Sequence, residues 1–310
     1  MNNNESKKEA VKTASEGVGG LKKEMELSSW HEGASCVCCL NSYPNGITFS
    51  IHTAEQAGRG QESINRFGLR LRDTRSYQLP VGKYFLYKKD IRANLEKHLW
   101  ALRKKGKLED AVIYFGTIAD PFSAFHRRFD NTIACLELLE KYLPLRVVIQ
   151  TRSPMLIAAL PILKKYGDRA IANMYIETPK ETCIMRYTPG QPSVSQRLLA
   201  IQGVRTQGVK VAITAGPILP YGDFNRDAWD FAELIDRYSD YVSVSALATD
   251  AAEKSLRNME LTTKLDADKQ YKLLRPEAYK PLLMALTSIC PEKLVLPSLV
   301  RPSQMDLFAA

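Results

Sequence analysis

Three cysteines stand close together near the start of the sequence, at Cys36, Cys38 and Cys39, out of six in the chain. A turn-rich stretch follows them over residues 41–46. Thiolates at this density, in a chain without a secretory signal, favour ligation of a soft metal or an iron–sulfur cluster over a disulfide framework. The alternative is that they are small apolar residues packed in a core. We expect ligation, in a loop at the mouth of a barrel of strands and helices.

A basic segment extends from Arg66 to Lys107 and contains 13 Lys and Arg residues against three Asp and Glu residues. This local excess accounts for the formal net charge of +9 of the 310-residue chain. Aromatic residues are interleaved with the charges between Phe67 and Tyr87. Cationic groups neutralise phosphates and flat rings stack on unpaired bases, so the segment predicts contact with DNA or another nucleic acid. For residues 97–107 a solvated helix face is the favoured alternative.

The composition, 45% hydrophobic, allows one substantial core or two modest ones. No apolar run approaches the roughly 20 residues that cross a bilayer, and the first residues lack a signal-peptide core. We therefore expect a cytoplasmic protein with no membrane partner. The expected organisation is a polar tail without fixed structure at 1–27, a barrel at 28–250, an extension at 251–300 and a flexible tail at 301–310.

Apolar strand-like runs alternate with helix-type periodicity along most of the chain. Strands are predicted at 47–51, 83–87, 111–115, 146–150, 171–177, 209–215 and 241–247. Helices are predicted at 90–105, 131–142, 193–207 and 227–238, and another begins after Ser153. Strands separated by single helices imply a parallel sheet with right-handed crossovers. The predicted fold class is α/β, a partial (β/α)6 TIM-like barrel with an irregular helical C-terminal extension.

In such a barrel, functional residues gather at the carboxyl ends of the strands. The residues at these positions are polar and of mixed charge, which suits a small zwitterionic ligand. They are Thr117, Asp120, Thr151, Arg152, Tyr175, Glu177, Thr178, Gly216, Pro217 and either Ser243 or Ser245.

Four segments, in this order, resemble motifs of radical S-adenosylmethionine (AdoMet) proteins related to spore photoproduct lyase. Residues 116–122 are similar to the family's Gly-Thr-x-x-Asp-Pro-Tyr segment, and residues 148–153 to its Val-x-Thr-Lys-Ser strand end. Residues 187–197 are similar to a Glu-Pro-x-x-Pro-Ser-x-x-x-Arg pattern. Residues 208–220 are similar to Gly-(Ile/Val)-x-Val followed by Ala-Pro-Ile-x-Pro. The similarity extends from about residue 83 to residue 223.

The resemblance implies a partial barrel of the radical AdoMet type with a [4Fe–4S] cluster. It implies an enzyme that cleaves AdoMet to a 5′-deoxyadenosyl radical and acts, lyase-like, on nucleic acid, in DNA repair. By the family pattern, Arg152 replaces a lysine near the methionyl carboxylate, a swap that conserves charge but not geometry. The other implied cofactor-binding residues are Thr117, Asp120, Tyr175, Glu177, Arg197, Gly216 and Pro217.

The cysteine motif departs from the family's Cys-x-x-x-Cys-x-x-Cys. With Cys36 and Cys39 in its second and third slots, Glu32 stands where the first cysteine belongs. Either Cys38 serves as the third ligand, or the cluster is incomplete or bound differently; carboxylate is a harder ligand than thiolate. The family's hydrogen-donating cysteine also has no counterpart, because Thr117 stands at about that position, which argues against spore photoproduct itself as substrate.

The sequence ends with a motif, Gln304-Met305-Asp306-Leu307-Phe308, that is similar to the peptide by which bacterial DNA polymerases and repair proteins bind the sliding clamp. An extended tail can place two apolar side chains in a pocket; the alternative is that the tail folds back on its own core.

Two other functions stay open. One is a catalytically degenerate barrel that binds DNA or the clamp. The other is a zinc-binding structural protein whose fourth ligand is Glu32, His31 or His52.

Overall fold

A computed structural model describes the backbone of residues 23–27, 37–43, 46–51, 54–57 and 84–88, and residues 91–116, 120–122, 126–247 and 260–295. Side chains are described only in the second group, without those of 126–128 and 260. Among the helices that the structure describes in these ranges, none has the length and apolar character to cross a membrane.

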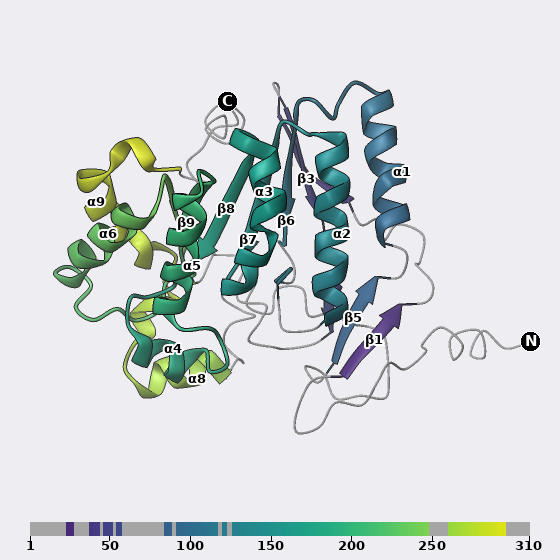
Figure 1. Ribbon diagram of the computed structural model, residues 1–310. Helices are drawn as coiled ribbons and strands as arrows, with labels where there is room; N and C mark the ends of the chain where they lie inside the picture. Colours follow the sequence, from purple (N-terminus) through teal and green to yellow (C-terminus); the bar gives the residue numbers. More distant parts are fainter. Residues whose placement is uncertain are drawn as a thin grey trace, which may run out of the picture.

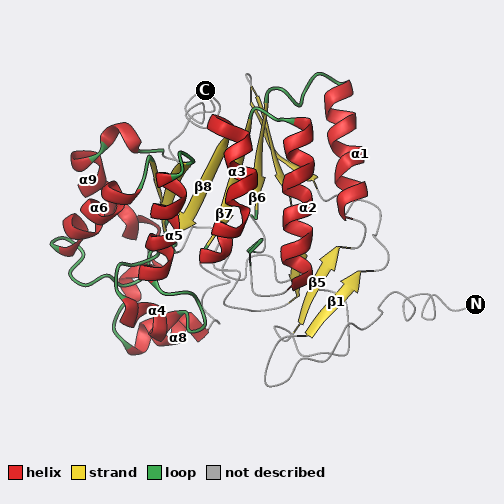
Figure 2. Cartoon of the chain, viewed as in Figure 1, coloured by secondary structure: helices red, strands yellow, loops and turns green. Residues whose placement is uncertain are grey.

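A seven-stranded sheet forms the centre of the protein (Figures 1 and 2). Neighbouring strands pair in parallel except for the outermost pair, β2 with β3, which is antiparallel. The sheet is not closed, since β10 and β2 lie at opposite ends of the strand order. In that order the strands are β10 (Tyr241–Val244), β9 (Lys210–Ala215), β8 (Ala170–Tyr175), β7 (Arg146–Thr151), β6 (Ala111–Phe115), β3 (Gly46–Ile51) and β2 (Val37–Tyr43).

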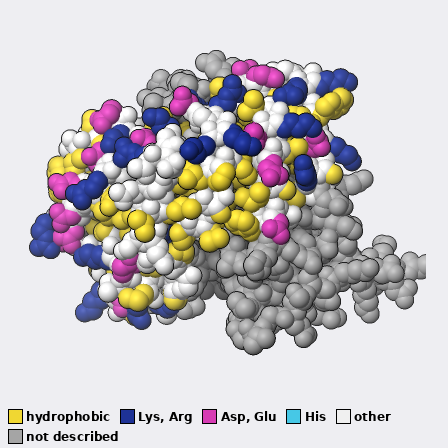
Figure 3. Space-filling model, in the orientation of Figure 1, with side chains coloured by type: hydrophobic (Ala, Val, Ile, Leu, Met, Phe, Trp, Pro, Cys, Tyr) yellow, Lys and Arg dark blue, Asp and Glu magenta, His cyan; other side chains and the backbone are white. Residues whose placement is uncertain are grey.

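Helices cover one face of this sheet (Figure 1). Their apolar sides and the helix-facing residues of the strands form one continuous core. They are α1 (Ile91–Lys104), α2 (His126–Tyr142), α3 (Leu160–Tyr166), α5 (Val194–Thr206) and α6 (Asp227–Tyr238). Apolar side chains reach the surface on the face of the molecule that Figure 3 shows. Met155, Ile157 and Leu199 are among the large apolar residues that are exposed.

The opposite, concave face of the sheet is apolar only at its amino end. There Val112, Val148, Ile171 and Ala212 form a small second core, which Val295 completes. Val295 is held in place because its backbone N–H donates to the carbonyl of Val242, at 2.6 Å. This apolar group of five residues, which we call the floor, seals the amino end of the partial barrel.

The remaining elements are short. β1 (Lys23–Leu27), β5 (Tyr84–Lys88) and β4 (Ala54–Ala57) form a separate sheet in that order. α4 (Glu181–Tyr187) follows β8, and α8 (Glu260–Ala267) and α9 (Lys280–Ile289) belong to the C-terminal extension. In the described ranges, short 3-10 helices span Pro154–Ala159, Gly167–Arg169, Tyr271–Leu274, Pro276–Tyr279 and Pro291–Lys293.

The predicted α/β partial barrel with a helical extension is confirmed. Several local predictions differ. α2 begins at His126, five residues before the predicted start at 131, and β1 lies inside the stretch expected to be a tail. Cys38 and Cys39 lie in strand β2 and not in a loop, because they pair with Ser50 and Phe49 of β3. Sequence periodicity could not show this pairing, which also includes a register shift between Cys39 and Asn41.

Candidate functional site

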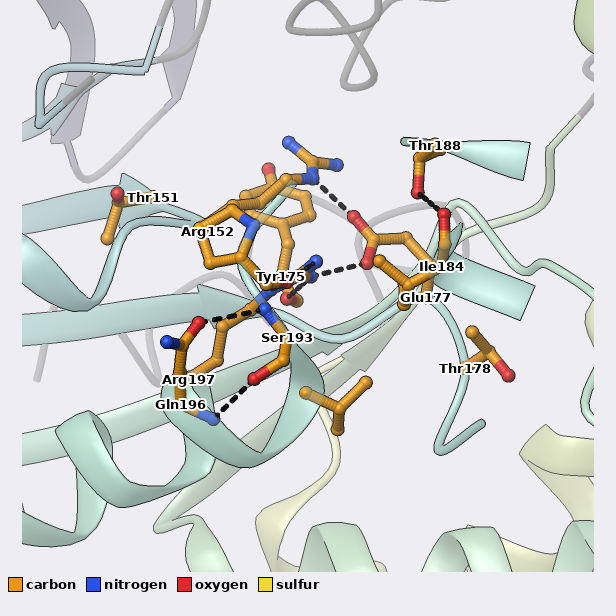
Figure 4. A network of polar contacts seen from close by, with 12 residues as sticks. Thr151, Arg152, Tyr175, Glu177, Thr178, Ile184, Thr188, Ser193, Gln196 and Arg197 are labelled. Atoms are coloured by element: carbon orange, nitrogen blue, oxygen red, sulfur yellow. Dashed lines mark hydrogen bonds and ion pairs between the residues drawn. The ribbon is translucent and has the colours of Figure 1, made fainter. Parts of the chain in front are cut away.

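The carboxylate of Glu177, just after β8, lies at the centre of a buried network (Figure 4). One oxygen accepts a hydrogen bond from Nη1 of Arg197 at 2.6 Å, and the other accepts one from Nε of Arg152. Glu177 and Arg197 are fully buried, and Arg152 is 3% exposed. Charges are buried at this depth only when they are paired and hydrogen-bonded. The network therefore fixes the positions of all three side chains.

The pKa of Glu177 lies below its usual value of 4.5. Burial by itself raises the pKa of a carboxyl group, since it disfavours the charged form. Here the positive charges of Arg197 and Arg152, together with their hydrogen bonds, outweigh burial. Glu177 is consequently an anion at neutral pH and does not supply a proton.

Arg197 holds several backbone segments together. Its Nε and Nη2 donate to the carbonyl of Pro192 at 2.9 and 2.7 Å, and its Nη1 also donates to the carbonyl of Tyr175 at 3.0 Å. The helix that carries Arg197 begins at a capping box between Ser193 and Gln196. Since all three guanidinium nitrogens bind protein atoms, Arg197 acts as a positioning residue for Glu177.

Arg152 is positioned from two sides. Its guanidinium carbon lies 4.6 Å from the centre of the Tyr175 ring, a cation–π contact. Its backbone N–H donates to Asp120 Oδ2 at 2.7 Å, while Asp120 Oδ1 accepts from the hydroxyl of Thr151 at 2.7 Å and from the backbone N–H of Phe122 at 2.9 Å. Asp120 thus ties the segment after β6 to the end of β7. We interpret it as a residue that places Arg152.

Gly216 allows β9 and the segment after β10 to approach closely. A Cβ at this position would lie 2.2 Å from Ser245 Oγ and 2.5 Å from the Ser245 carbonyl oxygen. The φ of Gly216 is 152°, a backbone conformation that residues with a side chain rarely adopt. The following chain returns to the network, because Leu219 N–H donates to the Glu177 carbonyl at 2.9 Å. Gly216 and Pro217 therefore lie at the same edge as Glu177, both buried.

A row of polar side chains on the concave face was not singled out by the sequence prediction as a group. We define the polar row as Gln150, Asn173, Thr214 and Ser243. Gln150 pairs in register with Asn173, and Thr214 with Ser243. Each of these residues interrupts an apolar run in the middle or late part of its strand, and in β7 the polar Thr151 follows Gln150. This repeated interruption is a signal that could have identified the row.

The cysteine segment begins at the same edge of the sheet. Val37, the first residue of β2, pairs with Ile51, and Ile51 pairs with Phe115, the last residue of β6. Cys36 precedes Val37 and, like Thr117 and residues 304–308, lies outside the described residues. The predicted roles of these residues stay predictions. Among side chains that the structure describes, no group of three His, Cys, Asp or Glu residues could hold a metal ion.

The described cysteine side chains are distributed over separate elements. Cys135 and Cys290 are buried, and Cys183 is half-buried on α4. Burial raises the pKa of the Cys183 thiol, and it raises that of Cys290 to about 11. These thiols are therefore protonated at neutral pH, which is typical of cysteines with a structural role.

Comparison with known proteins relates the chain to one enzyme fold. No protein-family model matches the sequence. An uncharacterized protein, ORF301 of Acidianus two-tailed virus, is 28% identical over 244 residues, which cover 78% of this chain and 73% of the viral protein.

The structural similarity is to spore photoproduct lyase. A complex of that enzyme with dinucleoside spore photoproduct superposes with a TM-score of 0.56 at 13% identity, over 84% of this chain and 78% of the enzyme. A variant with bound AdoMet and dinucleoside spore photoproduct gives 0.54 at 13% identity, over the same shares. At this identity the similarity is one of fold, and the chain has the fold of this radical AdoMet lyase.

Proposed function

We propose that this chain is a radical AdoMet enzyme, lyase-like, that acts on nucleic acid. The observation that carries the proposal is the Arg152–Glu177–Arg197 network, placed at the carboxyl edge of a sheet with the fold of spore photoproduct lyase. One neighbour of that fold holds AdoMet and a dinucleoside lesion. A ligand of mixed charge suits an edge at which a guanidinium, an aromatic ring and a close-packed glycine meet.

The residues at this edge fit AdoMet. Arg152 is a permanent cation suited to the methionyl carboxylate, and Glu177 with Tyr175 fixes its direction. Gly216 and Pro217 would lie near the adenine. Thr117 would contribute from the end of β6. In this assignment Asp120 and Arg197 support the site from behind, through Arg152 and Glu177 respectively.

The iron–sulfur cluster would be held by Cys36, Cys38 and Cys39. Three thiolates within four positions are the right donor chemistry for iron, and β2 begins at the edge where Arg152 lies. When bound, the cluster supplies the electron that cleaves the sulfonium of AdoMet. Successive residues of a regular strand alternate between the two faces of a sheet. A site that uses both Cys38 and Cys39 therefore requires a local departure from strand geometry.

Anaerobic reconstitution with iron and sulfide tests the proposal. We expect near four irons and four sulfides per chain, and 5′-deoxyadenosine from AdoMet after reduction. Cys36→Ser, Cys38→Ser and Cys39→Ser should each lower both values. Cys183→Ser, on α4 and outside the site, is the matched control and should change neither. Stoichiometric zinc, or a colourless protein that still binds DNA, would contradict the proposal and favour one of the two alternatives.

The proposed nucleic-acid partner has its own test. The proposal rests on the part of the basic segment before α1, because the charges that lie exposed at Lys97 and residues 103–105 belong to the stretch for which a solvated helix face is the favoured alternative. We expect binding of single-stranded DNA that weakens steeply as salt is raised, since each neutralised phosphate releases counterions. An affinity indifferent to salt would contradict this part of the proposal.

The sliding clamp is proposed as a second partner, on the sequence of residues 304–308 alone. A double variant, Leu307→Ala with Phe308→Ala, should abolish co-elution with a bacterial clamp and leave AdoMet cleavage unchanged. Retained co-elution would show that this motif is not the contact.

A further inference from the structure

The polar row on the concave face has a directed hydrogen-bond chain. The hydroxyl of Thr214 donates to Asn173 Oδ1 at 3.0 Å, and the same hydroxyl lies 2.8 Å from Ser243 Oγ. A hydroxyl has one proton, and Thr214 uses it on Asn173. Ser243 must therefore be the donor to Thr214. The chain leads from Ser243 through Thr214 to Asn173.

This chain fixes the orientation of the Asn173 amide. Its oxygen is turned toward Thr214, so its NH2 group faces away from β9, with two donors that make no hydrogen bond to the described residues. The hydroxyl hydrogen of Ser243 is used in the hydrogen bond to Thr214, so Ser243 can only accept further hydrogen bonds, through its lone pairs. A fixed donor pair and a fixed acceptor are thus presented on the same face of the sheet.

Gln150 adds a second amide beside Asn173. The two residues pair in register on β7 and β8. Within the described part of the chain, the Gln150 side chain makes no hydrogen bond, although it is half-buried. A half-buried amide can exchange a bound water for a polar group of a ligand. The Gln150 amide lies beside the oriented amide of Asn173, so one ligand could contact both.

The surroundings of the row define the size and place of that ligand. On the amino side lies the apolar floor with Val148, Ile171 and Val295, which offers no polar contact. On the carboxyl side, Arg152 and Tyr175 each follow a row residue by two positions, about 6–7 Å along a strand. A flat heterocycle fits this level better than an anion, because the row itself contains only neutral amides and hydroxyls.

We infer that the polar row is the subsite that binds a nucleobase and reads its edge, with Asn173 as donor and Gln150 as the adaptable second amide. The Gln150 amide can match adjacent donor and acceptor atoms of a base edge, and Asn173 adds donors alone, since its oxygen accepts from Thr214. The inference rests on the proposed function, since it names the part of the nucleic acid that would sit next to the AdoMet site. It goes beyond that function by assigning base selection to these residues.

The test uses the full-length protein and fluorescently labelled homopolymeric single-stranded DNA of each of the four bases, with an abasic strand as the phosphate-only probe. We expect one base to bind tighter than the others and than the abasic strand. Asn173→Asp keeps the shape and the acceptor for Thr214 but removes both donors. It should weaken the preferred base about tenfold and change the order of preference.

Two further variants keep the inference falsifiable if Asn173→Asp does not fold. Gln150→Leu loses no hydrogen bond within the described protein and should lower the same base preference. Gln202→Leu, exposed on α5, is the matched control and should leave it unchanged. Equal binding of all four bases and the abasic strand by the wild type, or an unaltered preference in every row variant that folds, would overturn the inference.

A separate readout distinguishes this inference from the proposed function. 5′-Deoxyadenosine formation without DNA is measured in the same reconstituted preparations. Cleavage of AdoMet without any base preference would leave the proposed chemistry intact and overturn the role of the polar row. A base preference that Asn173→Asp removes, in a protein that never cleaves AdoMet, would overturn the proposed chemistry and support the role of the polar row.

Discussion

The two faces of the same parallel strands differ in composition and in task. On the helix-covered face, β7, β8 and β9 contribute mainly apolar, buried residues, such as Ile149, Met174 and Ile213. On the concave face, the same strands change along their length from the apolar floor to the polar row and then to the charged network. Parallel strands buried on both faces usually have near-continuous apolar sequences. The departure from this rule on one face marks where a ligand is expected.

The largest expected effect comes from removing the charge at the centre of the concave-face network. Glu177→Gln keeps the size of the side chain but removes the carboxylate that two buried guanidinium groups share. Breaking a buried ion pair in this way should lower the free energy of unfolding by about 3–5 kcal/mol. Urea denaturation measures this loss of unfolding free energy, and Glu233→Gln, at an exposed glutamate, is the control. A change below about 1 kcal/mol would show that the network contributes little to stability.

Neighbouring residues of β9 test the difference between the faces directly. Ile213 is fully buried against the helices, and Thr214 faces the concave side. Ile213→Ala should cost about 2–5 kcal/mol, because it leaves a cavity in the main core. Thr214→Val, which keeps the shape and removes one hydroxyl, should cost about 1 kcal/mol. The opposite order in thermal or urea unfolding would mean that the concave face, and not the helix-covered face, determines stability.

Glycines at the two ends of β9 sharpen the comparison. Gly216→Ala should cost about 2–4 kcal/mol and weaken AdoMet binding, because the new Cβ would collide with Ser245. Gly208, before β9, has a φ of +83° but no atom within 4 Å of such a Cβ. Gly208→Ala should therefore cost about 1–2 kcal/mol and leave AdoMet binding unchanged. Equal losses of AdoMet affinity in the two variants, measured by calorimetry, would show that Gly216 is not part of the AdoMet site.

The smallest effect is the pH dependence that Glu177 imposes. Its folded-state pKa lies below the usual 4.5, so its stabilising contribution is fully present above pH 4.5 and is lost as pH falls through the folded-state pKa. The difference in unfolding free energy between the wild type and Glu177→Gln should be constant from neutral pH down to about pH 4.5 and should decline below that pH. A difference that grows below pH 4.5 would contradict the lowered pKa.

Much of the helix-covered half could be predicted from the sequence, because its signals are local. The run 111–115 is continuous and apolar and coincides with β6, and the capping residue Ser193 marks the start of α5. α4 was missed because it is only seven residues long. β2 was missed because its strand conformation depends on pairing with β3, which no local pattern shows.

The candidate site was predicted as a set of residues but not as a set of contacts. Arg152 was expected near the methionyl carboxylate of AdoMet, and Glu177 and Arg197 were expected to contact AdoMet or to frame its pocket. Arg152 lies 25 residues before Glu177 in the sequence, and Arg197 lies 20 residues after it. Only the pairing of β7 with β8 and the packing of α5 bring the three side chains together. The polar row was missed because each strand contributes one residue to it, and these residues form a row only when neighbouring strands are aligned.

The floor of the barrel has a consequence for how the protein is made. Val295 packs beneath strands that end at residue 244, so the segment after α9 must be synthesised before the interior is sealed from below. A growing chain on the ribosome can assemble the helix-covered layer first, since domains form as their elements emerge. Any cofactor loaded before that last segment arrives would meet an interior that still lacks its apolar floor.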